Sequence, residues 1–228
     1  MVQVEIAAFF TVICLIISLV FLRIFWRYKS LKKIVILGVQ GSGKTSFFTK
    51  LCYGHKQKAY TSTQLNEAVC CFFPGKKVIL VDFPGHLKFY HLFSEIKHIR
   101  CIVFMIDSSS MIKNADHVVY QLYRLLKDAR SKKIRHILIA ANKEDLFTSL
   151  PCTKISSIIE EKLSEIVLFR LRGIAEIDKE IDDDDDWLLN SEKTIHLNNI
   201  EGFDIAVLTG SVKNDHLSPW TNWMSRFF

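Results

Sequence analysis

Two patterns of hydrophobic and polar positions alternate along the chain after residue 32. Short apolar runs rich in β-branched side chains are typical of buried strands, and longer stretches with apolar residues three or four positions apart are typical of amphipathic helices. The short runs predict strands at Lys33–Leu37, Ala68–Phe73, Lys77–Asp82, Cys101–Asp107, His136–Asn142 and Asp204–Thr209. The longer stretches predict helices at Lys44–Tyr53, Leu87–His98, Ala115–Arg130, Cys152–Arg172 and Ser218–Phe228.

This alternation predicts an α/β domain over residues 33–228, with a mostly parallel six-stranded sheet flanked by helices. The segment Phe73-Pro74-Gly75-Lys76 is a tight-turn sequence between two successive strands. It therefore predicts an antiparallel hairpin that leaves one edge strand reversed. Residues 173–199 break the pattern. Their acidic run from Asp182 to Asp186 is more typical of a solvated surface insertion than of a metal site.

The first 32 residues have a different pattern, with a long apolar stretch. No charged residue occurs from Ile6 to Leu22, and Ile24-Phe25-Trp26 continue the stretch after Arg23. A stretch of about 20 apolar residues suits one bilayer crossing, and an arginine near its end can extend to the interface. A cleaved signal peptide and a buried core helix are the alternatives. Residues 1–32 are therefore predicted to be a single transmembrane helix with a basic juxtamembrane segment.

Charge predicts the orientation of this anchor. The chain carries a net charge of +6, and its first basic residues, which all follow the predicted span, are Arg23, Arg27, Lys29, Lys32 and Lys33. The positive-inside rule then places the C-terminal domain in the cytosol, and the cluster suits anionic headgroups. The basic stretch at residues 130–136 is more typical of a solvated helix end than of a nucleic-acid surface, so no direct nucleic-acid partner is expected. The six cysteines form no CxxC pair, which predicts reduced thiols and no metal centre.

The first candidate chemistry is a phosphate-binding loop directly after the first predicted strand. Residues 38–45 read GVQGSGKT, which is the complete GxxxxGK[ST] pattern between a strand and a helix. Its backbone N–H groups would surround phosphate oxygens, Lys44 would reach the β- and γ-phosphates, and Thr45 would bind Mg²⁺. The predicted nucleotide contacts here are Gly38, Val39, Gln40, Gly41, Ser42, Gly43, Lys44, Thr45 and Ser46. A turn without function is the alternative, and the strand–loop–helix context argues against it.

A second motif, DxxG, follows the predicted strand that ends at Asp82. Asp82 would hold Mg²⁺ through water, and the N–H of Gly85 could bond a γ-phosphate oxygen. Between these two motifs lies a candidate switch loop, Thr61-Ser62-Thr63-Gln64. Such a loop supplies a hydroxyl to Mg²⁺, so Thr63 is the predicted third ligand and Thr61 the alternative.

Two further segments predict which base is bound. Asn142-Lys143-Glu144-Asp145 matches NKxD at the end of a strand, and a carboxylate at Asp145 would accept hydrogen bonds from guanine N1–H and its exocyclic amine. Adenine offers neither donor in that geometry, so the buried acid would be left unpaired. After the last strand, Ser211 and Val212 belong to a loop whose backbone N–H could reach guanine O6. The predicted cofactors are therefore GTP or GDP and Mg²⁺.

The motifs GVQGSGKT, DFPGH, NKED and GSVK, in this order, resemble those of the small GTPase superfamily over roughly residues 33–228. The N-terminal span, the DxPGH sequence and the late insertion are similar to the beta-subunit family of signal recognition particle receptors. That resemblance implies an Arf-like domain on a single-pass anchor in the endoplasmic reticulum membrane. It also implies GTP-dependent binding of the receptor's alpha subunit, with the translocon or the ribosome as further candidate neighbours. On that alignment Gln64 takes the place of the Mg²⁺-binding threonine, so the choice between Thr63 and Gln64 stays open.

Hydrolysis is predicted to be slow or stimulated by a partner. Ras-like proteins orient the attacking water with a glutamine after DxxG, and here the position holds His86. His86 is the candidate catalytic residue, and simple packing is its alternative role. Gln40 would crowd the γ-phosphate, and no arginine finger is evident in the sequence. The alternatives to a receptor switch are a GTP-bound scaffold without turnover and an Arf-like trafficking GTPase with other effectors.

Overall fold

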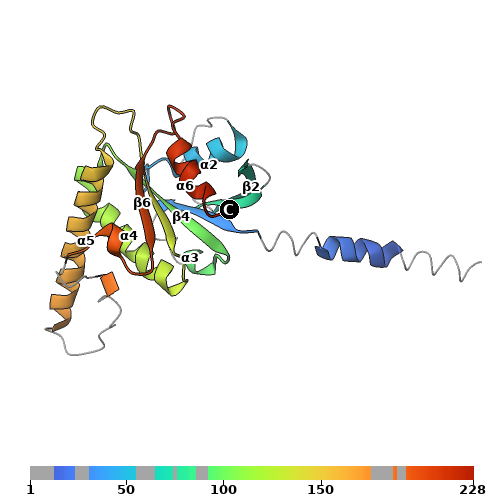
Figure 1. Cartoon of the computed structure of the whole chain (residues 1–228), viewed down its shortest axis with the longest axis horizontal. Helices are drawn as coiled ribbons and strands as arrows, with labels where there is room; N and C mark the ends of the chain where they lie inside the picture. The colour runs from blue at the N-terminus through green and yellow to red at the C-terminus, as the bar shows by residue number, and fades with distance from the viewer. Residues whose placement is uncertain are drawn as a thin grey trace, which may run out of the picture. The chain divides into compact units, whose positions relative to one another are not determined.

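The computed structural model describes residues 13–23, 31–54, 65–73, 76–85, 92–175, 187–188 and 194–228. The chain divides into two compact units, Met1–Lys32 and Lys33–Phe228. The second unit is an α/β domain built on one sheet (Figure 1). The strands of the sheet are β1 (Lys33–Gly38), β2 (Asn66–Phe73), β3 (Lys76–Asp82), β4 (Ile99–Asp107), β5 (His136–Asn142) and β6 (Asp204–Thr209).

The six strands lie in the order β2-β3-β1-β4-β5-β6. All neighbours run parallel except β2 and β3, which are antiparallel and paired as far as Phe73 and Lys76. The predicted mostly parallel sheet with one reversed edge strand is therefore confirmed. The parallel strands bring the carboxyl ends of β1, β3, β4, β5 and β6 to one edge of the sheet, where sites form in α/β folds.

Helices cover both faces of the sheet. They are α2 (Lys44–Tyr53), α3 (Leu92–Glu95), α4 (Met111–Ser131), α5 (Cys152–Ala175) and α6 (Ser218–Ser225), with a short 3-10 helix η3 at Leu197–Asn199. Helices α4 and α5 pack together on one face, and α2 and α6 lie on the other (Figure 1). Their apolar sides and the strand interiors form the core. Such burial of the helical apolar stripe is the main source of helix stability in proteins.

Two predicted helices and the predicted insertion differ in extent from the structure. The described part of the predicted helix at 87–98 is helical only over Leu92–Glu95, and His98 has a φ of 62°, a left-handed conformation that starts the turn into β4. Helix α6 ends at Ser225. Within the predicted insertion, Leu188, Ile195 and Leu197 are buried, because these apolar side chains dock on the domain. The run Asp182–Asp186 lies outside the described residues.

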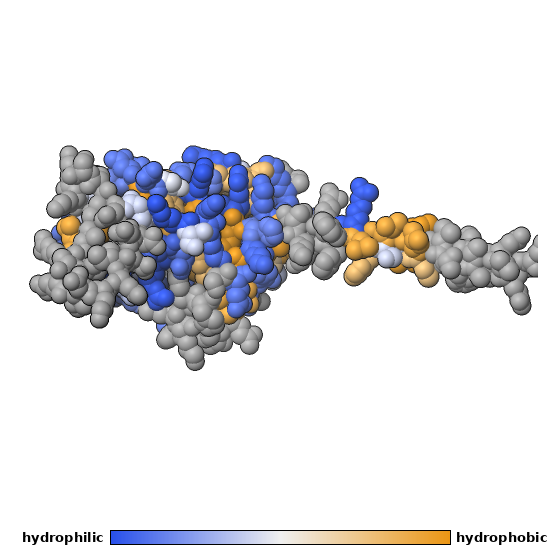
Figure 2. Space-filling view, turned by 90° about the horizontal axis from the view of Figure 1, so that it is seen from below, coloured by the Kyte–Doolittle hydropathy of each residue, from blue (hydrophilic) through white to orange (hydrophobic). Residues whose placement is uncertain are grey.

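The first unit contains a helix at residues 13–23 with exposed apolar side chains. Leu15 and Phe21 are 61% and 69% exposed, and Figure 2 shows a mostly hydrophobic surface on this helix. In the parts of the chain that the structure describes, no helix combines the length and apolar content needed to cross a bilayer. Because the predicted span begins outside the described residues, the transmembrane helix stays a prediction.

The expectation that all cysteines are reduced is wrong for one pair. Cys52 and Cys70 form a disulfide with a Cα–Cα distance of 5.2 Å. The two residues are 18 positions apart. They meet because α2 packs against the edge strand β2, which a search for closely spaced cysteines cannot detect. Among the described residues no group of three or more His, Cys, Asp or Glu side chains is placed to hold a metal ion.

The core beneath α6 depends on Trp220. Its ring is fully buried, lies edge-on to Phe47 at 5.4 Å, and donates a hydrogen bond from Nε1 to the Leu208 carbonyl at 3.0 Å. Trp220→Ala should lower the free energy of unfolding by about 3–5 kcal/mol, because it removes a large buried side chain and leaves a cavity. Urea denaturation measures this loss. Phe169→Ala on α5, where the side chain is 78% exposed, is the matched control and should change stability by less than about 0.5 kcal/mol.

Candidate nucleotide-binding site

The phosphate loop connects β1 to α2 and requires glycine at two positions. Gly43 has a φ of 99°, and a Cβ there would overlap the side-chain amide of Asn142. Gly38 has a φ of 131°, and its Cβ would overlap the Met105 carbonyl oxygen. Left-handed backbone and close approach together exclude other residues. The loop is closed by hydrogen bonds to the Val39 carbonyl from Ser42 Oγ and Lys44 Nζ, each at 2.8 Å.

Lys44 is the buried cation of this loop. Its side chain begins α2 and is buried, and Asp82 is the nearby charge of opposite sign. Burial lowers the pKa of Lys44 to about 8, and the charge of Asp82 opposes that change. An ammonium group with little water around it interacts strongly with an incoming anion. This position suits the predicted role of Lys44 in neutralising phosphate charge, and that role stays a prediction.

The pKa of Lys44 makes nucleotide affinity depend on pH. Bound phosphate would raise this pKa, so binding above pH 8 requires uptake of a proton. We expect GTP affinity to be constant below pH 8 and about tenfold weaker at pH 9 than at pH 7. Calorimetric titration at several pH values measures this. Lys44→Arg is the control, because its guanidinium stays protonated and its affinity should not show this decline. An equal decline in both proteins would show that Lys44 is not the cause of the pH dependence.

The candidate magnesium ligands lie at adjacent strand and helix ends. Thr45 Oγ1 donates to Asp82 Oδ2 at 2.8 Å, and Asn66 Nδ2 donates to the same oxygen at 3.4 Å. Hydroxyl and carboxylate oxygens are the ligands that Mg²⁺ prefers, so this donor set fits the ion. Asn66 is an addition to the predicted site. It lies opposite Asp82 in the β2–β3 pairing, so its role depends on strand register.

Several predicted residues of the γ-phosphate side cannot be placed. Gly85 is described, and a Cβ on it would lie 2.6 Å from Lys44 Nζ, so this glycine leaves room for the lysine. The predicted switch residues Thr61, Ser62, Thr63 and Gln64 and the candidate catalytic His86 lie outside the described residues. Their proposed contacts with Mg²⁺ and water therefore stay predictions.

Asn142 joins the phosphate loop to the loop after β6. Its Nδ2 donates to the Ser42 carbonyl at 2.8 Å, and its Oδ1 accepts from the Val212 N–H at 3.1 Å. The two partners are 100 and 70 residues away in the chain. The buried amide thus holds three loops in one arrangement and keeps one N–H and one oxygen lone pair beyond these two bonds.

Asp145 is the candidate base-reading carboxylate. Ser211 Oγ donates to its Oδ1 at 2.6 Å, and Lys213 Nζ lies 3.6 Å from its Oδ2. The hydrogen bond from Ser211 is the main cause of the lowered pKa of Asp145, and Lys213 adds to it. The group is therefore an ionised acceptor at neutral pH, held in position before a ligand arrives. That is the state required to accept two hydrogen bonds from guanine.

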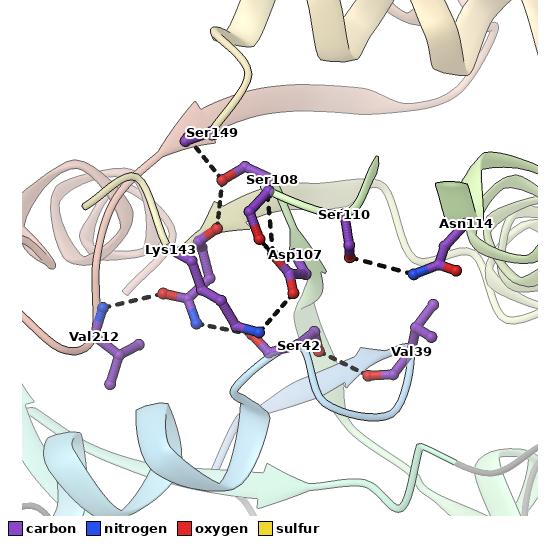
Figure 3. Close-up of polar contacts among 11 residues, drawn as sticks. Val39, Ser42, Asp107, Ser108, Ser110, Asn114, Lys143, Ser149 and Val212 are labelled. Carbon is purple, nitrogen blue, oxygen red and sulfur yellow. Dashed lines mark hydrogen bonds and ion pairs between the residues drawn. The ribbon is translucent and has the colours of Figure 1, made fainter. Parts of the chain in front are cut away.

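A second carboxylate, missed by the sequence analysis, orients the lysine of NKxD. Lys143 has a φ of 69°, and its Nζ donates to Asp107 Oδ2 at 2.5 Å (Figure 3). Burial alone would raise the pKa of Asp107, but hydrogen bonds from Lys143 and Ser109 lower it further than burial raises it. Ser108 Oγ supports the same strand end by donating to the Asn142 carbonyl at 2.6 Å. The sequence contained one indication of this role, because the apolar strand β4 ends in an aspartate, Asp107, just as β3 ends in Asp82.

Residues of the phosphate loop and of the start of α2, the NKxD segment and the loop after β6 line one cavity of about 360 Å³. This volume lies within the range of small-molecule sites. Two of its lining residues, Leu146 and Lys213, were not in the predicted set. The complete lining is Gly41, Gly43, Ser46, Asn142, Lys143, Asp145, Leu146, Val212 and Lys213. The structure therefore brings the phosphate loop, the NKxD segment and the last loop to one cavity, which can hold a purine beside a chain of phosphates.

Known proteins share both the sequence and the fold. The family model for the signal recognition particle receptor beta subunit matches residues 29–206. The receptor's beta subunit from Saccharomyces cerevisiae is 30% identical over 206 residues, which cover 84% of this chain and 82% of that protein. The corresponding subunit from Mus musculus is 28% identical over 73% of this chain and 64% of its own length.

Solved structures agree with the fold. A structure of the mammalian signal recognition particle receptor matches with a TM-score of 0.74 and 23% identity, covering 86% of this chain and all of that chain. The Chaetomium thermophilum receptor complex of GTP-bound SRb with SRX matches with a TM-score of 0.63 and 18% identity, covering 87% of this chain and 99% of that one. Since the family model matches well over half of the sequence, the chain belongs to the signal recognition particle receptor beta subunit family.

Proposed function

We propose that the protein is a guanine-nucleotide switch, anchored in the endoplasmic reticulum membrane, that recruits the alpha subunit of the signal recognition particle receptor. The observation that carries this proposal is the pre-positioned Asp145 carboxylate in the same cavity as the phosphate loop. A carboxylate there pairs with the N1–H and amino group of guanine, and an adenine offers it neither of these donors. Val212, whose N–H is already bonded to Asn142, and Ser211 fix the loop beside it.

The phosphate side of the site fits the triphosphate and its metal ion. In the proposed complex, Lys44 and the loop N–H groups hold the phosphates, while Thr45 and Asp82 hold Mg²⁺. The ion supplies charge neutralisation when bound. Thr63, with Gln64 as the alternative, would complete the site in the GTP state. His86 would orient water for a slow hydrolysis, so the lifetime of the GTP state depends on partners more than on this chain.

Family membership and a solved complex support the partner. The Chaetomium thermophilum relative is described as a complex of GTP-bound SRb with SRX. We infer that the GTP form of the present chain likewise binds the receptor's alpha subunit during co-translational targeting. The translocon and the ribosome remain candidate neighbours on the same membrane, and the proposal requires no contact with nucleic acid.

The membrane attachment rests on the N-terminal unit. The helix at residues 13–23 exposes apolar side chains that water disfavours, and the basic residues of the first 33 positions begin at its last residue, Arg23. We propose a single crossing that includes residues 6–22, with the nucleotide-binding domain on the cytosolic side. Alkaline extraction of microsomes should leave the full chain in the membrane. Protease added outside the microsomes should degrade the domain, and protection of the domain would contradict this topology.

Partner capture from detergent-solubilised membranes tests the switch. The full chain loaded with a non-hydrolysable GTP analogue should retain the alpha subunit, and the GDP-loaded chain should retain much less. Asp145→Asn should lose the difference with guanine nucleotides and regain it with the xanthine analogue, which separates nucleotide sensing from damage to the interface. Equal capture with GTP analogue and GDP would contradict a switch and favour a nucleotide-stabilised scaffold.

A further inference from the structure

The disulfide between Cys52 and Cys70 joins two elements that both lead to the proposed magnesium site. Cys52 lies in the last turn of α2, whose first turn carries Thr45. Cys70 lies in β2, whose first residue is Asn66. Thr45 and Asn66 both donate to Asp82 Oδ2. A closed circuit of covalent bonds and hydrogen bonds therefore runs from α2 through the disulfide and β2 to Asp82 and back to α2.

Reduction of the disulfide removes the covalent connection between α2 and β2. Strand β2 is at the edge of the sheet and has a neighbour on only one side, β3. Without the disulfide, no covalent bond holds β2 to α2, and β2 is held by its pairing with β3 and by side-chain contacts. Edge strands separate more easily than central ones. The relative position of Thr45, Asn66 and Asp82 is then less constrained. The disulfide therefore limits the motion of the groups that would hold Mg²⁺ and, through it, the phosphates.

The pair is placed for reversible chemistry. Cys52 is half-buried near the exposed end of α2, whereas Cys70 is 2% exposed, so an external thiolate would reach the Cys52 sulfur. Attack by a glutathione thiolate on Cys52 Sγ forms a Cys52–glutathione mixed disulfide and releases Cys70 as a thiolate. A second glutathione thiolate attacks the glutathione sulfur, which frees Cys52 as a thiolate and forms glutathione disulfide. The reverse reaction transfers two electrons from the two thiols to glutathione disulfide, which becomes two glutathione molecules.

The other described cysteines of the unit Lys33–Phe228 are not equivalent to this pair. Cys71 is exposed and, because side chains alternate along a strand, points to the opposite face of β2 from Cys70. Cys101 is buried, and burial raises the pKa of its thiol to about 12, so it stays protonated and unreactive. Cys152 begins α5, which lies on the other face of the sheet from α2. The geometry thus selects Cys52 and Cys70 specifically.

We propose that Cys52 and Cys70 form a reversible redox modification site that slows the release of bound nucleotide when it is oxidised. The effect on release rests on the nucleotide binding proposed above, whereas formation of the disulfide does not. This makes the exchange rate of the switch sensitive to the glutathione disulfide level of the compartment that the domain faces.

The first measurement concerns the bond alone. The full chain in detergent is equilibrated with glutathione buffers of different redox ratio, free thiols are alkylated, and peptides are identified by mass spectrometry. We expect a Cys52–Cys70 linked peptide that appears and disappears with the redox ratio. Absence of this peptide at every ratio, or linkage of Cys70 to Cys71 or of Cys52 to another cysteine, would overturn the proposal.

The second measurement is the release of fluorescently labelled GDP from oxidised and reduced protein. Release should be at least about fivefold slower after oxidation, the lower end of typical couplings between sites. Cys52→Ser and Cys70→Ala should each remove this redox dependence, and Cys71→Ser and Cys152→Ser should keep it. Equal release rates from linked and reduced protein would overturn the regulatory role. A protein that forms the disulfide but binds GDP in neither its oxidised nor its reduced form would instead show that the proposed nucleotide binding is wrong. The proposed regulation would then be wrong as well.

Discussion

Asp145→Asn is expected to weaken GTP binding by at least about a hundredfold, because two charge-assisted hydrogen bonds to the base are lost. The amide that replaces one carboxylate oxygen is a donor and faces the donors of guanine N1 and N2. Xanthine carries a carbonyl in place of the guanine amino group and can accept a hydrogen bond from this amide. The variant should therefore bind xanthosine triphosphate better than GTP, which inverts the preference of the wild-type chain.

Competition against a fluorescent guanine nucleotide measures both changes. The matched control is Glu144→Gln, which removes the neighbouring carboxylate. Glu144 pairs with His216 at 3.0 Å, and both side chains are partly exposed, so its loss should leave GTP affinity nearly unchanged. Retained GTP affinity in Asp145→Asn, together with no gain for the xanthine nucleotide, would show that Asp145 does not read the base.

Gly43→Ala is expected to abolish detectable nucleotide binding. The alanine Cβ would overlap the Asn142 amide, and the residue would still need a φ near 99°. Relief of this overlap must move Asn142, and with it the bonds from Asn142 to Ser42 and Val212. Since Asn142 holds three loops together, we expect affinity for GTP to fall by more than about a hundredfold, and stability to fall by about 1–3 kcal/mol.

Gly54→Ala separates the loss of binding from backbone strain. Gly54 ends α2 with a φ of 73°, and a Cβ on it would have open space around it. This variant should lose about 1 kcal/mol of stability, as expected for a left-handed residue, and keep its affinity for GTP. Calorimetric titration and urea denaturation of both variants distinguish the two effects. Equal GTP affinity of the two variants would contradict the proposed arrangement of the phosphate loop.

Much of the fold and of the site could be read from local sequence, for a physical reason. A buried parallel strand must be continuously apolar, so runs such as Lys33–Leu37 and His136–Asn142 mark the sheet directly. The phosphate loop and NKxD are contiguous segments whose chemistry requires residue types at fixed spacing. The hairpin was predictable because Pro74 and Gly75 leave few alternatives to a tight turn.

Contacts across strands could not be predicted in this way. The pairing of Asn66 with Asp82 depends on the register of β2 and β3, and that of Lys143 with Asp107 depends on which strands are neighbours. The disulfide likewise requires α2 to pack on β2. The sequence also gave no sign that Leu188, Ile195 and Leu197 dock on the domain, because isolated apolar residues in a polar stretch show no period.

The proposed switch requires a cavity that selects guanine over other bases. Calorimetric titration of the full chain in detergent micelles with Mg²⁺ and either GTP or ATP tests this directly. We predict that GTP binds at least about a hundredfold more tightly than ATP, since adenine offers the Asp145 carboxylate neither of the two donors that guanine presents to it. Equal affinity for the two nucleotides, or binding of neither at millimolar Mg²⁺, would contradict the proposed guanine-nucleotide switch.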